Sequence, residues 1–338
     1  MVINLRKIVR PAAVIAILAV SVIFWLTFSG RESRFMLGAI IHENCRTEHE
    51  AAQPVSGRWE NNMDDERFQR PSKQPAMKLK YDFKDFQGVG KVPKFSTAEN
   101  VIHAYYAILK EAENMKGYHG GCGTIGMAKT PYPYAYELLA PQTRQEMSLE
   151  EFIKSFSGIG HMTLLKLYSA YQPANSAENI LYYVAEIEVI TGPPVTSANE
   201  NTPQPSYFAY YYGLITAEKV PSEGWKIRRV DYVPEDFLCA PYHLWDWDAK
   251  ALVEIVYGEW YKLIDKIERV EKENSIVSVY ARGSTGEYRF DFLRLTNGED
   301  ILLHEYIIEN GKLRELNLLK DEHQIYKFSI LNPNLQGN

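Results

Sequence analysis

The pattern of apolar and polar positions divides the chain into an apolar start, a polar stretch and two regions with regular periodicity. Between Pro11 and Gly30 the chain has no ionisable residue, and the run AAVIAILAVSVIFWLTF is almost wholly apolar. About 20 helical residues, at 1.5 Å each, cover the roughly 30 Å hydrocarbon core of a bilayer. We therefore expect residues 1–30 to form a short cytoplasmic tail and a transmembrane anchor.

Basic residues flank the apolar run unevenly. The short tail before it carries Arg6, Lys7 and Arg10, whereas Arg31 and Arg34 follow it. This bias favours a cytoplasmic N-terminus and an extracytoplasmic body. A cleaved signal peptide is the alternative, but its apolar region is usually about 7–15 residues, which is shorter than this run. We expect a single-pass protein of the cell membrane, and the sequence leaves cleavage open.

The next segment, residues 31–92, has few side chains that can build a core. Its central run, SGRWENNMDDERFQRPSKQP, is charged and polar. Such a composition buries too little apolar area to offset the entropy lost on ordering. We therefore predict a polar spacer.

Helical periodicity begins after this segment. Ser96 to Glu99 match a capping box, and the apolar residues that follow share one face of a helix, namely Val101, Ile102, Tyr105, Ile108 and Leu109. A shorter helix is predicted from Tyr134 to Leu139. A second capping box, Ser148 to Glu151, begins a third helix that buries Phe152, Ile153 and Phe156.

The period then changes from helical spacing to alternation. Alternating apolar residues, rich in Tyr, Ile and Val, predict strands at residues 162–168, 180–189, 207–216 and 225–233. No helical pattern separates these strands, so we expect an antiparallel meander and not a parallel sheet with crossover helices.

A second patterned region covers residues 246–322 and leaves 323–338 as a tail. Asp248 can cap a helix with apolar residues at Leu252, Val253, Val256, Trp260, Leu263, Ile264 and Ile267. Strands are predicted at residues 276–281, 288–295, 301–308 and 313–319, and Asn297-Gly298 and Asn310-Gly311 favour tight hairpin turns. The simplest arrangement is a small α+β domain, with one helix on a four-stranded antiparallel sheet.

The first region, residues 94–245, resembles the nuclear transport factor 2-like (SnoaL-like) cone fold. The resemblance covers about residues 94–236 and depends on the order of elements and on the segments TAENVIHAYYAILKEA, YELLAP, SLEEFIKSF and GWKIRRVDY. It implies helices on a curved antiparallel sheet, with a pocket between them. Enzymes of this fold use an Asp, His or Tyr in the pocket for proton transfer, so the resemblance makes His103, Tyr105, His161 and Asp231 the catalytic candidates.

Aromatic residues are the main candidates for a binding surface. Tyr and Trp combine a large apolar area with a polar tip, which suits both interfaces and strand packing. The residues that we single out are Tyr132, Tyr134, Tyr211 and Trp245.

Cysteine and histidine give little indication of a metal site. His42, Cys45 and His49 form an H-x2-C-x3-H cluster, but a closed structural zinc site needs four ligands and this cluster lies in the spacer. We therefore expect neither a metal nor a cofactor. Cys122 and Cys239 could form a disulfide if the body is exported.

The net charge excludes one broad class of partner. The formal charge is −6 and basic residues are not clustered, which argues against nucleic-acid binding. We expect a membrane-anchored, extracytoplasmic, non-enzymatic module that binds an envelope protein or a small ligand. Two alternatives stay open: an exported enzyme of the SnoaL or ketosteroid isomerase kind, and a structural oligomerisation component of an envelope assembly.

Overall fold

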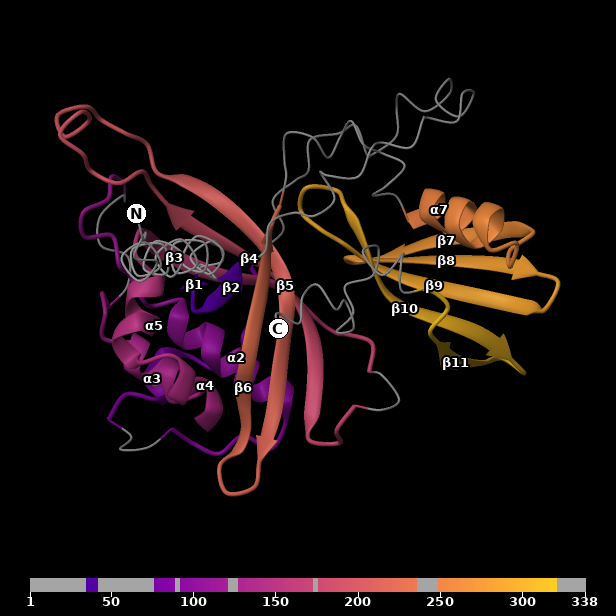
Figure 1. The fold of residues 1–338 in the computed structure, drawn as a ribbon, viewed down its shortest axis with the longest axis horizontal. Coiled ribbons are helices and arrows are strands. Elements are labelled where there is room, and N and C mark those ends of the chain that lie inside the picture. Colours follow the sequence, from indigo (N-terminus) through magenta and orange to yellow (C-terminus); the bar gives the residue numbers. More distant parts are fainter. Residues whose placement is uncertain are drawn as a thin grey trace, which may run out of the picture. The chain divides into compact units, whose positions relative to one another are not determined.

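The computed structural model describes residues 35–41, 76–88, 92–120, 127–172, 176–235 and 249–320. These residues form a mixed α+β protein with two sheets (Figure 1), which agrees with the predicted α+β class. The predicted transmembrane anchor and C-terminal tail lie outside the described residues. Among the described helices, none has the length and apolar character needed to cross a membrane.

The first sheet contains the predicted meander. Its strands are longer than the sequence pattern indicated: β3 (Ile159–Ser169), β4 (Ile180–Thr191), β5 (Tyr207–Val220) and β6 (Gly224–Pro234). Consecutive strands pair antiparallel, as predicted. The order across the sheet is β1-β2-β6-β5-β4-β3, so two further strands lie beside β6.

Those two strands come from the segment that we predicted to be a spacer, and the prediction is wrong for these residues. β1 (Phe35–Met36) and β2 (Ala39–Ile41) flank a tight turn in which Leu37 and Gly38 have φ angles of 60° and 69°. β2 pairs in parallel with β6, with Ile40 opposite Asp231. Leu37 is 1% exposed, so a short apolar run within a polar stretch is enough to bind the sheet.

Residues 76–88 also pack on the first sheet. The amide of Met77 donates to the carbonyl of Leu164 on β3 at 2.9 Å. A single 3-10 turn, η3 (Phe83–Asp85), buries Phe83, and Phe86 follows it into the same core. The end of the predicted spacer is therefore part of the folded body.

Four short helices cover one face of the first sheet (Figure 1). They are α2 (Ala98–Leu109), α3 (Tyr132–Tyr136), α4 (Pro141–Glu146) and α5 (Leu149–Ser155). The predicted capping box at Ser148 is confirmed. At α2 the cap is Thr97 and not Ser96, because the Thr97 hydroxyl accepts from the amide of Asn100 while Glu99 pairs with Lys80 at 2.9 Å.

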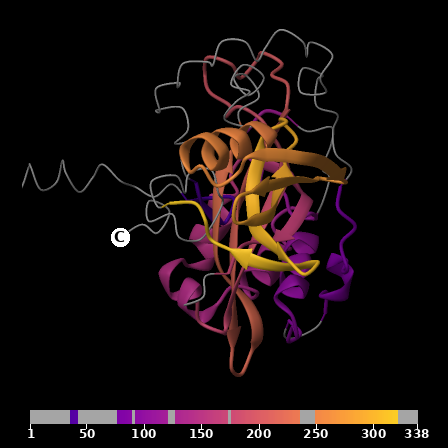
Figure 2. The same ribbon diagram turned by 90° about the vertical axis from the view of Figure 1, so that its right-hand side faces the viewer.

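The second sheet has five strands, in the order β11-β10-β9-β8-β7. The strands are β7 (Lys266–Glu273), β8 (Ile276–Gly283), β9 (Gly286–Arg294), β10 (Asp300–Glu309) and β11 (Lys312–Leu316). One face is covered by α7 (Ala249–Leu252) and the π-helix η5 (Val253–Trp260), as Figures 1 and 2 show.

The prediction of four strands is therefore wrong by one. We assigned Ile267 to the helix, but the helical segment ends at Trp260, and Lys262 follows with a φ of 54°. An L-residue with positive φ breaks helical geometry. The chain then reverses and forms β7 at the edge of the sheet, where Ile267 pairs with Ala281.

Apolar contacts also join strands of the two sheets. Leu293, Leu295, Ile301 and Leu303 of the second sheet share one buried cluster with Val184, Tyr212, Leu214 and Val233 of the first. These residues of the first sheet lie on the face that its helices do not cover. The first sheet is thus buried on both faces at this point.

Candidate functional site

The space between the first sheet and its helices is where the resemblance predicts a pocket, and aromatic side chains occupy it. Tyr105, Tyr106, Phe152, Phe156 and Tyr232 are each no more than 1% exposed. The rings of Phe152 and Phe156 have centroids 5.0 Å apart, and those of Tyr105 and Tyr106 are 5.4 Å apart. This part of the fold is a packed core.

Two of the buried tyrosines in this core are paired with each other. The hydroxyls of Tyr106 and Tyr232 form a hydrogen bond, which satisfies two buried polar atoms at once. Burial raises the pKa of both phenols well above the usual value, so neither supplies a phenolate at neutral pH. The Tyr105 hydroxyl is buried against Gly38.

His103 lies on α2 at the edge of this core. It is 2% exposed, and its Nε2 atom is 3.4 Å from a carboxylate oxygen of Glu99 one turn earlier. Burial, followed by the nearby charge of Lys80, lowers the pKa of His103. The imidazole is therefore neutral at pH 7, and its partner Glu99 is itself bound to Lys80.

His161 lies at the other end of α2. It is on β3, near Lys110 at the C-terminal end of that helix, and burial is the largest cause that lowers its pKa. His103 and Lys110 are separated by seven residues, or roughly 10 Å along a helix. The structure therefore places the two candidate histidines at different ends of the core.

Asp231 is on the opposite face of β6 from Tyr232, because neighbouring side chains on a strand alternate. Tyr232 belongs to the core under the helices, whereas the carboxylate of Asp231 pairs with Arg229 at 2.8 Å. The predicted catalytic candidates are thus distributed over both faces of the sheet and do not converge on one point.

A buried group of charged side chains lies where the two sheets meet. Lys166 on β3 is 4% exposed and forms an ion pair with Glu186 on β4, which is fully buried. The Lys166 amine also donates to the carbonyl of Arg294 at 2.7 Å, and Glu186 accepts from the amide of Thr296 at 2.8 Å. Both charged residues therefore bind backbone of the second sheet.

Glu235, directly after β6, adds a second carboxyl to this group. It accepts from the amide of Asn297 at 3.1 Å. Burial and then the neighbouring Glu186 raise the pKa of Glu235 well above its usual value. We name Lys166, Glu186 and Glu235 the inter-sheet charge cluster.

Glu235 in the inter-sheet charge cluster has a raised pKa, but the cluster lacks the accessibility that catalysis needs. Shifted pKa values mark active sites, but buried ion-pair networks shift them equally. Here the backbone carbonyl of Arg294 and the backbone amides of Thr296 and Asn297 hydrogen-bond to the cluster, so main-chain atoms cover it. Sequence reasoning missed it because a charged residue alternating with apolar ones on a strand normally indicates a solvent-facing side.

The face of the second sheet opposite α7 and η5 carries a row of Arg and Tyr side chains. The guanidinium of Arg269 lies 3.6 Å from the ring centroid of Tyr280, and that of Arg289 lies 5.6 Å from the same ring. Register places Tyr306 next to Arg289. We name these four residues the Arg–Tyr row, and all of them are at least partly exposed.

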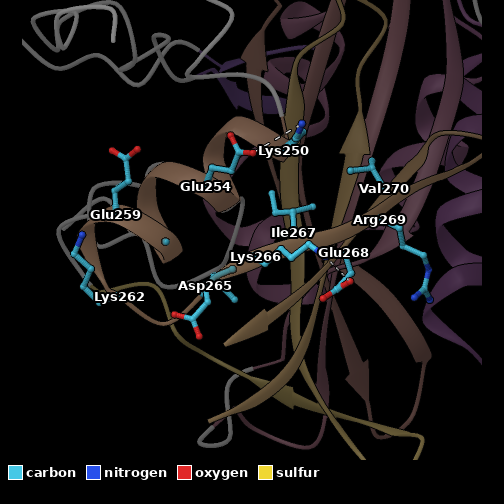
Figure 3. Close-up of a pocket in the computed structure, with 12 residues that line it drawn as sticks. Lys250, Glu254, Glu259, Lys262, Asp265, Lys266, Ile267, Glu268, Arg269 and Val270 are labelled. Atoms are coloured by element: carbon cyan, nitrogen blue, oxygen red, sulfur yellow. Dashed lines mark hydrogen bonds and ion pairs between the residues drawn. The ribbon is translucent and has the colours of Figure 1, made fainter. Parts of the chain in front are cut away.

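A groove of about 700 Å³ lies between η5 and the edge strand β7 (Figure 3). Its charged lining is balanced between basic and acidic side chains: Lys250, Lys262, Lys266 and Arg269 against Glu254, Glu259, Asp265 and Glu268. Several of these are paired, such as Lys250 with Glu254 at 3.9 Å and Lys266 with Glu268 at 3.4 Å. Balanced, water-exposed charges give no preference for a cation or an anion.

The aromatic residues that we predicted as candidates for a binding surface differ in how deeply they are buried. Tyr132 is 1% exposed, with its ring 4.8 Å from that of Phe156, so it packs in the core. Tyr134 and Tyr211 are partly buried and pack against Phe83 and Tyr232, with ring centroids 5.3 and 6.2 Å apart. Trp245 lies outside the described residues.

The cysteine and metal candidates also fall outside the described residues. These are His42, Cys45 and His49 for the metal, and Cys122 and Cys239 for the disulfide. Among the residues that the structure does describe, no group of His, Cys, Asp or Glu is arranged to hold a metal ion.

Comparison with known proteins gives only a distant likeness. No family model matches the sequence, and no curated protein matches it. Among solved structures, one weak structural neighbour is described as an "Ntf2 like protein involved in plasmid conjugation". It is 10% identical, the match covers 56% of this chain and 98% of that chain, and the TM-score is 0.19.

Proposed function

We propose that this chain is a non-enzymatic binding module of the cell envelope. In this proposal a transmembrane helix within residues 1–30 holds the chain, and the folded body lies outside the cytoplasm. The first sheet and its helices then form a nuclear transport factor 2-like domain that serves as a scaffold.

The observation that carries the proposal is the filled core of the first sheet. A cone-fold enzyme needs a cavity with a base or acid inside it. Here Tyr105, Tyr106, Phe152, Phe156 and Tyr232 occupy that space. The alternative of a SnoaL-like enzyme is disfavoured because His103, His161 and Asp231 do not share a site.

The Arg–Tyr row supports a role in binding. Tyr and Arg are among the residue types enriched at the centres of protein interfaces, since each combines a broad contact area with directional hydrogen bonds. Arg269 and Tyr280 are already stacked, so part of the ordering cost of binding is met in the free protein.

Affinity capture from gently solubilised native membranes tests this function. The tagged full-length chain is compared with the double variant Arg269→Ser, Tyr280→Ser, and with a control, Arg282→Ser, Glu287→Ser, which removes an exposed ion pair on the same sheet. We expect one or more envelope proteins to co-purify with the wild type and the control, and to be depleted with the double variant. Equal recovery with all three chains, or none with any, would contradict the proposed function of this surface.

A further inference from the structure

The end of the hairpin between β4 and β5 exposes apolar side chains on a segment that is nearly free of charge. Val195, Tyr207 and Phe208 are 40%, 53% and 51% exposed. Between Thr191 and Phe208 the sequence contains one acidic residue, Glu200, and no Lys or Arg. We name Val195, Tyr207 and Phe208 the aromatic tip. Tyr207 and Phe208 are consecutive on β5, so they expose an aromatic ring on each face of this end of the hairpin, where it can contact lipid or another molecule.

The aromatic tip is held in place by hydrogen bonds to a neighbouring loop. The amide of His119 donates to the carbonyl of Pro193 at 2.8 Å, and the amide of Val195 donates to the carbonyl of Gly117 at 2.9 Å. Within the hairpin, the side chain of Asn199 accepts from the amide of Thr196 at 2.7 Å. Because the loop is already ordered, docking it on a surface costs little additional conformational entropy.

The N-terminal strands point towards this tip. β2 is parallel to β6, and β6 is antiparallel to β5, so β2 runs towards the N-terminal end of β5, where Tyr207 lies. The Leu37–Gly38 turn reverses the chain before β2. The chain therefore enters β1 from the side of the sheet on which the tip is found.

Chain length then limits the distance between the tip and a bilayer. Ile40 is opposite Asp231, and Asp231 is opposite Leu214, seven residues from Tyr207. Seven strand residues extend roughly 23 Å. Five residues lie between Gly30, the end of the apolar run, and Met36, and the six Cα–Cα steps can reach at most about 22 Å.

We propose that the aromatic tip inserts into the headgroup layer of the same bilayer that holds the apolar segment of this chain. The inference rests on the membrane anchoring in the proposed function, and adds a second contact that fixes the body's orientation. Tyr is enriched at this depth because its ring enters the lipid while its hydroxyl stays hydrated. Because the tip lacks Lys and Arg, the contact is apolar and does not depend on anionic lipids.

Site-specific photocrosslinking in native membranes tests this contact. A photoreactive phenylalanine analogue replaces Tyr207 in the full-length chain, and as a control it replaces Val270, a 38% exposed residue on the edge strand of the second sheet. We expect several-fold more lipid adduct at Tyr207 than at Val270, with a yield unchanged by high salt. A protein adduct at Tyr207 would mean a protein partner at the tip, and would overturn the inference, as would equal lipid labelling at both positions.

Alkaline extraction of the same membranes separates the two proposals. If the chain is released as a peripheral protein, membrane anchoring fails and the tip inference fails with it. If the chain stays in the membrane but Tyr207 gives no lipid adduct, the tip inference alone is wrong. The variant Tyr207→Ser, Phe208→Ser should keep the thermal stability of the wild type, since both residues are exposed, while cutting lipid labelling from a probe at Val195 several-fold.

Discussion

At the scale of single residues, the inter-sheet charge cluster makes the stability of the chain sensitive to the loss of a single charge. Lys166 is the cation facing Glu186 and Glu235, and it is 4% exposed. Removing one partner of a buried ion pair leaves an uncompensated charge in a poorly solvated place. The effect on stability should far exceed that of a comparable pair on the surface.

Replacing Lys166 by Met tests this difference. We expect Lys166→Met to lower the free energy of unfolding by about 3–5 kcal/mol, because Glu186 loses its counter-charge. The matched control is Lys80→Met, which removes a pair with Glu99 that is 47% and 46% exposed, and it should cost less than about 1 kcal/mol. Chemical denaturation measures both, and equal losses would contradict the role given to burial.

Glu235 makes a prediction about pH. The pKa of Glu235 in the folded chain is raised above the ordinary value of 4.5. At a pH between the unfolded-state pKa and the folded-state pKa, the folded state therefore binds more protons than the unfolded state. Stability contributed by the protonated form is therefore present below pH 4.5 and is lost as the pH rises through the folded pKa.

Glu235→Gln should remove this pH-dependent loss of stability, because the amide cannot ionise. The free energy of unfolding should then change less with pH above pH 4.5, and the variant should be more stable than wild type at neutral pH. Glu99 is the control, because Lys80 lowers its pKa and reverses the sign. Glu99→Gln should instead reduce stability at neutral pH, and this difference from wild type should vanish as the pH falls. Thermal denaturation across pH 3–8 tests both, and parallel profiles for Glu235→Gln and wild type would contradict the assignment.

At the scale of elements, the β1–β2 turn depends on one glycine. A Cβ atom at Gly38 would lie 2.8 Å from both Phe152 and the hydroxyl of Tyr105, and its φ of +69° is unfavourable for other residues. Gly88 has a similar φ of +75° but nothing within 4 Å of its Cβ position. Comparing alanine substitutions at Gly38 and Gly88 therefore separates the cost of steric overlap from the cost of backbone strain.

We expect Gly38→Ala to cost about 1–3 kcal/mol more than Gly88→Ala, because overpacking adds to the strain that both share. Limited proteolysis should also cleave Gly38→Ala faster near β1 and β2. If the two variants have the same melting temperature, the turn is not packed against the core as described.

Sequence pattern predicts elements well where one physical signal dominates. The capping box at Ser148 and the strands at 180–189 and 225–233 are found because reciprocal caps and runs rich in β-branched and aromatic residues have few other interpretations. β7 was missed because Lys266–Glu273 is almost entirely charged, as suits an exposed edge strand, and carries no apolar alternation. β1 and β2 were missed because they are short and lie within a polar segment.

The candidate site was less predictable than the fold. The family resemblance places catalytic groups in a pocket, but the volumes of Phe152, Phe156 and Tyr232 determine whether space remains, and packing volume is not a pattern along the chain. The inter-sheet charge cluster depends on which strands of separate regions meet, and such contacts leave no local signal.

At the scale of the whole molecule, the apolar contacts between the sheets predict that they lose structure together. Leu303 is 3% exposed within the cluster that joins them, whereas Leu313 is 45% exposed on β11. We expect Leu303→Ala to cost about 2–5 kcal/mol and Leu313→Ala less than about 0.5 kcal/mol.

Hydrogen exchange adds the test of coupling. Leu303→Ala should increase amide exchange in β4 and β5 of the first sheet as well as in β9 and β10 of the second. Faster exchange confined to the second sheet would show that the two sheets open independently.

The parallel pairing of β2 with β6 has a consequence during synthesis. Ile40 cannot meet Asp231 until about 190 further residues have been made, which takes roughly 10–40 s at ribosomal rates. The first strands to leave the ribosome must therefore wait for the last strand of their sheet. Throughout that interval β2 lacks the strand with which it pairs, and the first sheet stays incomplete.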